Sequence, residues 1–282
     1  AIDAANRGNF QPTFAQRYFT TDNSFAKHFA NAEGMVRLSE MFRVQSQIEG
    51  YQSAQGLNAA NFGINFKLAV TAANAGRFDA TFAQKIAGTD TSFNRYVTNL
   101  QIRAQLAQSM EEAPAVKPLL DAQGIIFGEY IKSLGLGIAQ ANLPGGGHLQ
   151  SSFAERIMGV DGSASRYLGD ANLTLSTARM RSESGVMNSW LKNNGFSSEI
   201  AGRIESKLDD AMYAINRGDF RAGFGARLFG LDQSAATHIS HLQGMFEAIQ
   251  MKSDLGLISR EMTDAGMSKA FIAQFGRQLD GA

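Results

Sequence analysis

The chain has 282 residues, and 26 basic side chains balance 26 acidic ones to give a formal net charge of zero. Without a net positive field to attract a phosphate backbone, we expect no generic nucleic-acid binding. Cysteine is absent, which excludes disulfides, thiolate metal sites and any cofactor bound covalently through sulfur. Charged residues make up only 18% of the sequence, so the surface suits a protein covered by the protein subunits of a larger complex.

One pattern recurs four times along the chain, F-x-x-x-F-A-x-R-x-x-G-x-D-x-S with some departures. The second Phe, the Asp and a later Gly each recur at spacings of 68, 71 and 71 residues. A fixed period of this kind is typical of helical repeat proteins. We therefore expect one repeat domain with units over approximately 1–66, 67–137, 138–208 and 209–282. The repeat anchors are Phe14, Phe82, Phe153 and Phe224, Asp22, Asp90, Asp161 and Asp232, and Gly56, Gly124, Gly195 and Gly266.

Each repeat begins with a predicted short helix. Two Phe residues four positions apart, such as Phe78 and Phe82, share one face of such a helix. We expect these rings to be buried, so that replacing Phe14 or Phe82 with Ala costs about 3 to 5 kcal/mol. The repeated Asp and the Ser two positions later, such as Asp90 and Ser92, predict the N-cap of a long second helix. We read this pair as structural and expect Asp90→Ala to cost about 1 kcal/mol.

A third helix follows the Gly anchor, most clearly over Ser198–Ile215 and Ser268–Leu279. Period-two alternation is not sustained anywhere, so the sequence predicts an all-α fold of four tandem repeats, arranged as a solenoid or a compact bundle. The opening residues resemble the tail of such a third helix, and neither end shows a polar cap. We expect the ends to be covered by closure of the bundle or by other chains. The most apolar stretch, Gly124–Leu143, is interrupted by Glu129 and Lys132, so we expect no membrane span.

The sequence offers no catalytic group that we can assign. His238 and His241 stand one helical turn apart but lack a third metal ligand at matching spacing, so packing is favoured over a metal site. Pro144–Gly147 lacks the Lys-Ser/Thr ending of a phosphate-binding loop. An enzyme would need a polar pocket that breaks the repeat, and the irregular stretch Leu136–Leu149 is where we would expect it.

A basic residue recurs in the short helix at Arg17, Lys85, Arg156 and Arg227. These side chains are candidates for partner contacts, although an internal ion pair is the favoured interpretation. The 20 Phe and 11 Met residues suit a helical core, and they also leave open a carrier of an apolar ligand such as a pigment or lipid. The sequence does not identify a non-covalent ligand.

The Phe-rich helical repeat, taken over the whole chain, resembles the rod linkers of the red-algal phycobilisome at the level of architecture. Chains of that family fill the centre of phycobiliprotein hexamers. The resemblance implies a non-enzymatic linker or scaffold subunit of a light-harvesting antenna, on the stromal side of the thylakoid in a plastid. The coloured members carry bilins on cysteines, so the absence of cysteine implies a colourless linker.

Overall fold

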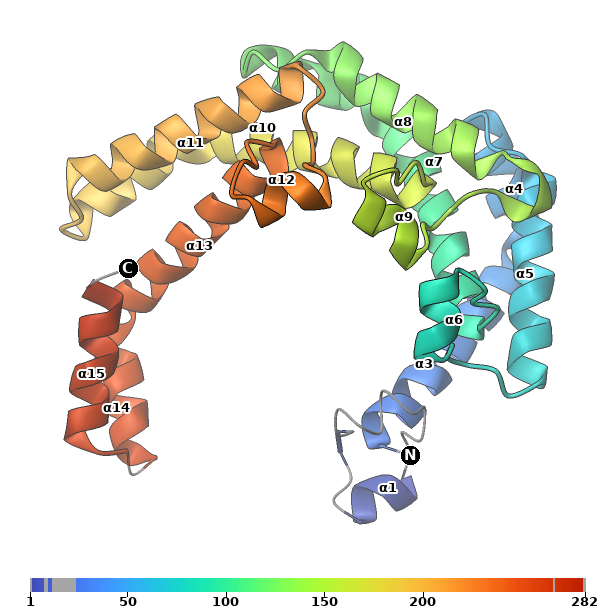
Figure 1. Cartoon of the computed structure of the whole chain (residues 1–282), viewed down its shortest axis with the longest axis horizontal. Coiled ribbons are helices and arrows are strands. Elements are labelled where there is room, and N and C mark those ends of the chain that lie inside the picture. The colour runs from blue at the N-terminus through green and yellow to red at the C-terminus, as the bar shows by residue number, and fades with distance from the viewer. Residues whose placement is uncertain (1, 8–9, 12–23, 266, 281–282) are drawn as a thin grey trace. The chain divides into compact units, whose positions relative to one another are not determined.

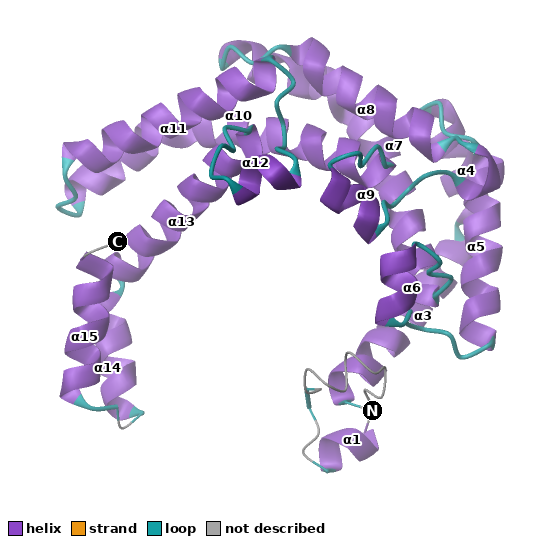
Figure 2. Cartoon of the chain, in the orientation of Figure 1, coloured by secondary structure: helices purple, strands orange, loops and turns teal. Residues whose placement is uncertain are grey.

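The computed structural model describes residues 2–7, 10–11, 24–265 and 267–280. Every regular element within these ranges is a helix, and no strand occurs there (Figure 2). The all-α prediction is confirmed. The helices are labelled in Figure 1, and the chain divides into two compact units. Unit 1 comprises Ala1–Pro118, Phe127–Asn172 and Gly223–Phe229, and unit 2 comprises Leu119–Ile126, Leu173–Ala222 and Gly230–Ala282.

The long helices begin one residue after Ser24, Ser92, Ser163 and Ser234. Two of them run for 30 residues, whereas the first and last are each interrupted by a single residue, Val44 or Asp254. The helices in chain order are α3 (Phe25–Arg43) and α4 (Gln45–Ala54), α7 (Phe93–Ala122), α10 (Ala164–Asn193), and α13 (Ala235–Ser253) and α14 (Leu255–Asp264).

The remaining helices are of two kinds. Those of the first kind follow the long helices and reproduce the predicted third helix: α5 (Ala59–Asn74), α8 (Phe127–Ala141), α11 (Ser198–Asn216) and α15 (Lys269–Asp280), with the five-residue α1 (Ile2–Asn6) near the start of the chain. Those of the second kind are short: α6 (Phe82–Ala87), α9 (Phe153–Met158), α12 (Phe224–Leu228) and the 3-10 turn η1 (Pro144–Gly146).

The core of unit 1 forms where α5 packs against α3 and α7. Phe62 and Phe66 of α5 lie against Leu38 of α3 and Val97 of α7, and most of these side chains are almost wholly buried. Burial of each large apolar side chain stabilises the fold by about 1.5 to 3 kcal/mol. The apolar residues of α5 recur at helical spacing, which is why one helix can contact two neighbours.

The core of unit 2 repeats this arrangement with other residues. Ile204 and Leu208 of α11 pack against Leu191 of α10 and against Ile239 and Leu242 of α13. In each unit, therefore, a third helix fills the space between two long helices that follow one another in the chain. The predicted helix over Ser198–Ile215 is confirmed as α11.

An extended segment before each short helix is tied to the next long helix. The Phe93 and Asn94 N–H groups donate to the carbonyls of Arg77 (2.8 Å) and Phe78 (3.1 Å). These bonds satisfy the first N–H groups of α7, which have no partner inside the helix. The same pair of bonds joins Ala164 and Ser165 to His148 and Leu149, and Ala235 and Ala236 to Asp219 and Phe220. The short helices that follow these segments are thereby anchored to the long helices.

Candidate functional site

The short helices α6 and α9 are held by their own caps. Each has a capping box, in which Thr81 or Ser152 accepts from the backbone N–H three residues later while Gln84 or Glu155 accepts in return. Both helices end at a glycine in the left-handed conformation, Gly88 at φ 69° and Gly159 at φ 71°. Local hydrogen bonds therefore shape these helices.

The apolar side chains of the short helices point outward. Phe82 is 48% exposed and Phe153 is 44% exposed, so the expectation that these anchor rings are buried is wrong. The physical reason is that Phe78, four residues before Phe82, takes the inner position. Its ring packs edge-on against the ring of Phe93, with 5.4 Å between the ring centroids. Phe14 lies outside the described residues, and so does the side chain of Phe224.

These exposed groups lie along one row of helices, because α6 contacts α9 and α9 contacts α12 (Figure 1). All three helices belong to unit 1. We call this surface the short-helix strip and define it by its exposed apolar side chains, Phe82, Ile86, Phe153, Ile157, Met158, Leu228 and Phe229. Contiguous exposed apolar side chains are typical of sites that bind a protein or another apolar surface.

The repeated basic residues lie on the same short helices. Lys85, Arg156 and Arg227 are all exposed, and none of them enters an ion pair in the part of the chain that the structure describes. The internal ion pair favoured from the sequence is therefore not formed there. Arg17 lies outside the described residues. The short-helix strip thus carries three positive charges beside its apolar groups.

The Asp–Ser pairs lie at the starts of the long helices as predicted, but the serine is the capping residue and the aspartate is not. Ser92 and Ser163 are the capping residues, because their Oγ atoms accept from N–H groups three positions later. Asp90 instead accepts from the Ser92 N–H at 2.8 Å, a local turn that orients the cap. The pKa of Asp161 lies below its usual value. Burial alone would raise this pKa, but the hydrogen bonds from Ser163 lower it by more. Asp232 accepts from Ser234 in the same way, and Asp22 lies outside the described residues.

The described Gly anchors are turns, and an asparagine side chain bridges the turns at Gly56 and Gly124. Gly56, Gly124 and Gly195 all have positive φ, between 69° and 80°, and Gly266 lies outside the described residues. Asn142 donates to the Gly56 carbonyl at 2.8 Å and accepts from the Asn58 N–H at 2.7 Å. One amide side chain thereby holds both edges of a turn that lies more than 80 residues away.

Unit 1 also contains a buried arginine. Arg103 is fully buried and donates to the carbonyls of Ala141 (2.6 Å) and Asn58, while its Nε has no partner within the described chain. Burial lowers the pKa of Arg103 to about 10. A cation beside the last carbonyls of α8 is favoured by the helix dipole. The arrangement ties α7 to the end of α8.

The irregular stretch Leu136–Leu149 is structural in this fold. The Nδ2 of Asn65 donates to the Gly146 carbonyl at 3.0 Å, which joins α5 to η1. Gly147 has φ 89°, and a Cβ atom there would lie 2.4 Å from the Ala141 carbonyl oxygen. The backbone therefore passes too close to α8 for any residue other than glycine at this position.

His238 and His241 face different surroundings. His238 is buried, and burial is the main cause that lowers its pKa, while Asp210 opposes the shift. Its Nδ1 lies 3.8 Å from the Asp210 carboxylate, whereas His241 is exposed. Across the described ranges, no group of three His, Asp or Glu side chains could hold a metal ion.

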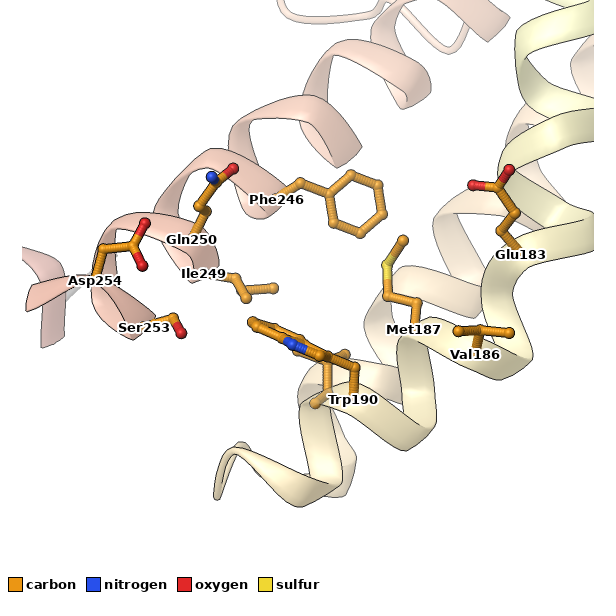
Figure 3. A pocket seen from close by; sticks show the side chains of 10 residues that line it. Glu183, Val186, Met187, Trp190, Phe246, Ile249, Gln250, Ser253 and Asp254 are labelled. Carbon is orange, nitrogen blue, oxygen red and sulfur yellow. The ribbon is translucent and has the colours of Figure 1, made fainter.

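An apolar pocket of about 550 Å³ lies between α10 and α13 in unit 2 (Figure 3). Met187, Trp190, Phe246 and Ile249 form its walls, and polar groups such as Gln250 stand at its edge. Trp190 stacks on Phe196 with ring centroids 6.0 Å apart. This size and lining suit a small apolar ligand. The sequence showed the Phe and Met residues but gave no signal for which of them would line a pocket.

Comparisons with known proteins found no family model, no curated protein and no solved structure that matches this chain. Within the residues that the structure covers, no helix is long and apolar enough to cross a membrane.

Proposed function

We propose that this chain is a non-enzymatic structural protein, a helical-repeat scaffold or linker subunit that binds other proteins in a larger assembly. The observation that carries the proposal is the short-helix strip. In the four-repeat organisation that we propose from the sequence, each short helix presents the same kind of group at the same position. A partner that follows the strip would meet the same chemistry at each step.

The strip is better explained by a partner than by the needs of the fold. The capping boxes of α6 and α9 and their C-terminal glycines already stabilise these helices locally. An exposed ring such as that of Phe153 adds little to the core, and it costs solubility unless something covers it. Aromatic and arginine side chains are enriched in protein interfaces, and the strip contains both.

The charges of the strip indicate the chemistry of the partner. Lys85, Arg156 and Arg227 are exposed beside the apolar groups, so a protein surface that alternates apolar and acidic groups is complementary. If the resemblance to phycobilisome rod linkers extends to function, the partners are phycobiliprotein hexamers and the location is the stromal side of a thylakoid.

The test is to isolate tagged chain from its native source under mild conditions and to measure the mass, composition and visible absorption of the complex. A double variant, Phe153→Ser with Ile157→Ser, should release the partner while far-UV circular dichroism stays unchanged. Ile126→Ser changes an exposed apolar residue outside the strip and is the matched control. A wild-type chain that runs alone at about its own mass would refute the scaffold role.

A carrier of an apolar ligand is the second candidate, and the pocket beside Trp190 favours it. The pocket volume of about 550 Å³ accommodates a pigment fragment or a lipid chain. Trp190 is the only tryptophan, so its fluorescence reports on the pocket without interference. Titration with an apolar probe such as a long-chain fatty acid should quench this emission in a saturable way. Met187→Glu should abolish the saturation, and a linear response in both proteins would exclude the carrier role.

A further inference from the structure

The apolar pocket of unit 2 is built by one face of each of two long helices (Figure 3). α10 and α13 each contribute four side chains at the spacing i, i+3, i+4 and i+7, which places the four on one face of a helix. They are Glu183, Val186, Met187 and Trp190 on α10, and Phe246, Ile249, Gln250 and Ser253 on α13. Leu191 and Ile249 also belong to the core of unit 2, so the walls of the pocket are continuous with that core.

The corresponding space in unit 1 is crossed by a hydrogen bond. Tyr51 of α4 stands at the repeat position of Trp190. Glu111 of α7 stands at the repeat position of Ser253. The Tyr51 hydroxyl donates to the Glu111 carboxylate and joins the two helices there. In unit 2, Trp190 stacks on Phe196 instead. The side-chain bridge that links two long helices in unit 1 is therefore replaced at the pocket by an indole and a short hydroxyl side chain.

Both charged side chains that line the pocket are acidic. Glu183 and Asp254 stand on opposite sides of it (Figure 3). Both are exposed, and neither forms an ion pair with any residue that the structure describes. No lysine or arginine is part of the lining, and Arg181, two residues before Glu183, pairs with Asp209 at 3.1 Å. The rim of an apolar pocket therefore carries two negative charges that no basic side chain of the lining neutralises.

We propose that the ligand of this pocket is an amphiphile with an apolar chain and a positively charged head, such as an alkylammonium ion. The proposal rests on the carrier role and adds the charge of the ligand. The apolar chain packs between Met187 and Phe246, and the head lies at the rim beside Glu183 or Asp254. The Trp190 ring is 41% exposed, so it can also attract a cation through its π face.

The charge of the head distinguishes this ligand from other amphiphiles. A fatty acid fits the apolar walls equally well, but its carboxylate would stand near two like charges at the rim, and like charges repel. A neutral head avoids the repulsion and gains no ion pair. Only a cation is complementary to both the walls and the rim, so we expect affinity to follow the sign of the charge on the head.

Three probes of equal chain length test the preference: decyltrimethylammonium, decanol and decanoate. Isothermal titration calorimetry of the whole chain at low ionic strength gives the three affinities. Emission of Trp190, the only tryptophan, reports whether binding occurs at the pocket. We expect decyltrimethylammonium to bind about 3- to 10-fold more tightly than decanol, and decanoate to bind about 3- to 10-fold more weakly than decanol.

A double variant, Glu183→Gln with Asp254→Asn, removes the two charges and keeps the shapes of the side chains. Both residues are exposed, and Asp254 makes no side-chain capping bond, so the fold should be kept. The three affinities should then lie within about 3-fold of one another. Glu247→Gln changes an exposed acid of α13 that does not line the pocket, and this matched control should keep the wild-type order.

The possible outcomes separate the charge preference from the carrier role. Equal affinity of wild type for the three probes, or tighter binding of decanoate, would overturn the preference and leave the carrier role intact. An unchanged order in the double variant would also overturn it, because the preference would then arise from other charges. The absence of saturable binding by every probe would overturn the carrier role and the preference together.

Discussion

Asn216 donates a hydrogen bond of 2.9 Å from its side-chain Nδ2 to the carbonyl of Gly124, 92 residues earlier in the chain. The same amide accepts from the Ile126 N–H at 2.8 Å. Asn142 and the Gly56 turn form the same pair of bonds in unit 1. The end of one third helix therefore holds the turn that starts the previous one, through two backbone groups of that turn.

Replacing Asn216 with Ala should lower the free energy of unfolding by about 1 to 2 kcal/mol, because both backbone groups lose their partner. Urea denaturation monitored by circular dichroism measures the change. Asn74→Ala is the matched control, since Asn74 stands at the same repeat position in α5 and is exposed. The control should change stability by less than about 0.5 kcal/mol. Equal losses in the two variants would mean that the bridge contributes nothing.

Arg103→Ala should destabilise the chain by about 3 kcal/mol. It leaves a cavity and removes the donor of the Ala141 and Asn58 carbonyls, which are partly or wholly shielded from water. Arg103→Met restores most of the volume and matches Met35 and Met245 at the same repeat position, so it should cost less than the alanine variant. If Arg103→Met lowers the free energy of unfolding as much as Arg103→Ala does, the hydrogen bonds contribute more than the packing at this position.

Ser92→Ala should cost about 1 kcal/mol, because Ser92 is the residue whose side chain caps α7. Asp90→Ala should cost less, about 0.5 kcal/mol, since Asp90 only orients the cap through the Ser92 N–H. Chemical denaturation of the two variants beside wild type decides the order. A larger loss of stability in Asp90→Ala than in Ser92→Ala would support Asp90 as the capping residue, as predicted from the sequence.

The sequence was sufficient to predict the helices because their signals are local. A serine before each long helix and a glycine after three of the four predicted short ones are read from neighbouring residues, and Ser24, Gly88 and Gly159 occupy those places in the structure. Periodicity also located α11 to within one residue of its end.

The candidate sites could not be predicted from the sequence, because they depend on contacts between residues far apart in the chain. Phe78 and Phe82 share one face of the expected helix, yet only Phe78 turns inward, because the residues before α6 are extended and bonded to α7. The pocket beside Trp190 requires α13 to lie against α10, which no spacing in the sequence specifies. The bridge from Asn216 to Gly124 likewise joins residues whose pairing depends on the packing of whole helices.

Phe62→Ala and Phe82→Ala should separate core from surface. Phe62 is fully buried between α3 and α7, so its loss should cost about 3 to 5 kcal/mol. Phe82 is 48% exposed, and its loss should cost less than about 1 kcal/mol in the isolated chain. Denaturant melts of both variants measure the difference. A loss of several kcal/mol at Phe82 would show that its ring serves the fold, and the short-helix strip would lose one of its defining residues.

Acid should destabilise the folded chain through His238. Burial lowers the pKa of His238 below its unfolded value near 6.5, so the folded state favours the neutral ring. The stability that this provides is fully present above pH 6.5 and is lost as the pH falls through the lower, folded pKa. His238→Tyr introduces the residue found at the same repeat position in Tyr96 and Tyr167, so its melting temperature should fall less than that of wild type between neutral pH and pH 5. His241→Gln changes an exposed histidine one turn further along and should melt like wild type at every pH. Parallel acid profiles for wild type and His238→Tyr would show that Asp210, 3.8 Å from the ring, compensates the buried charge.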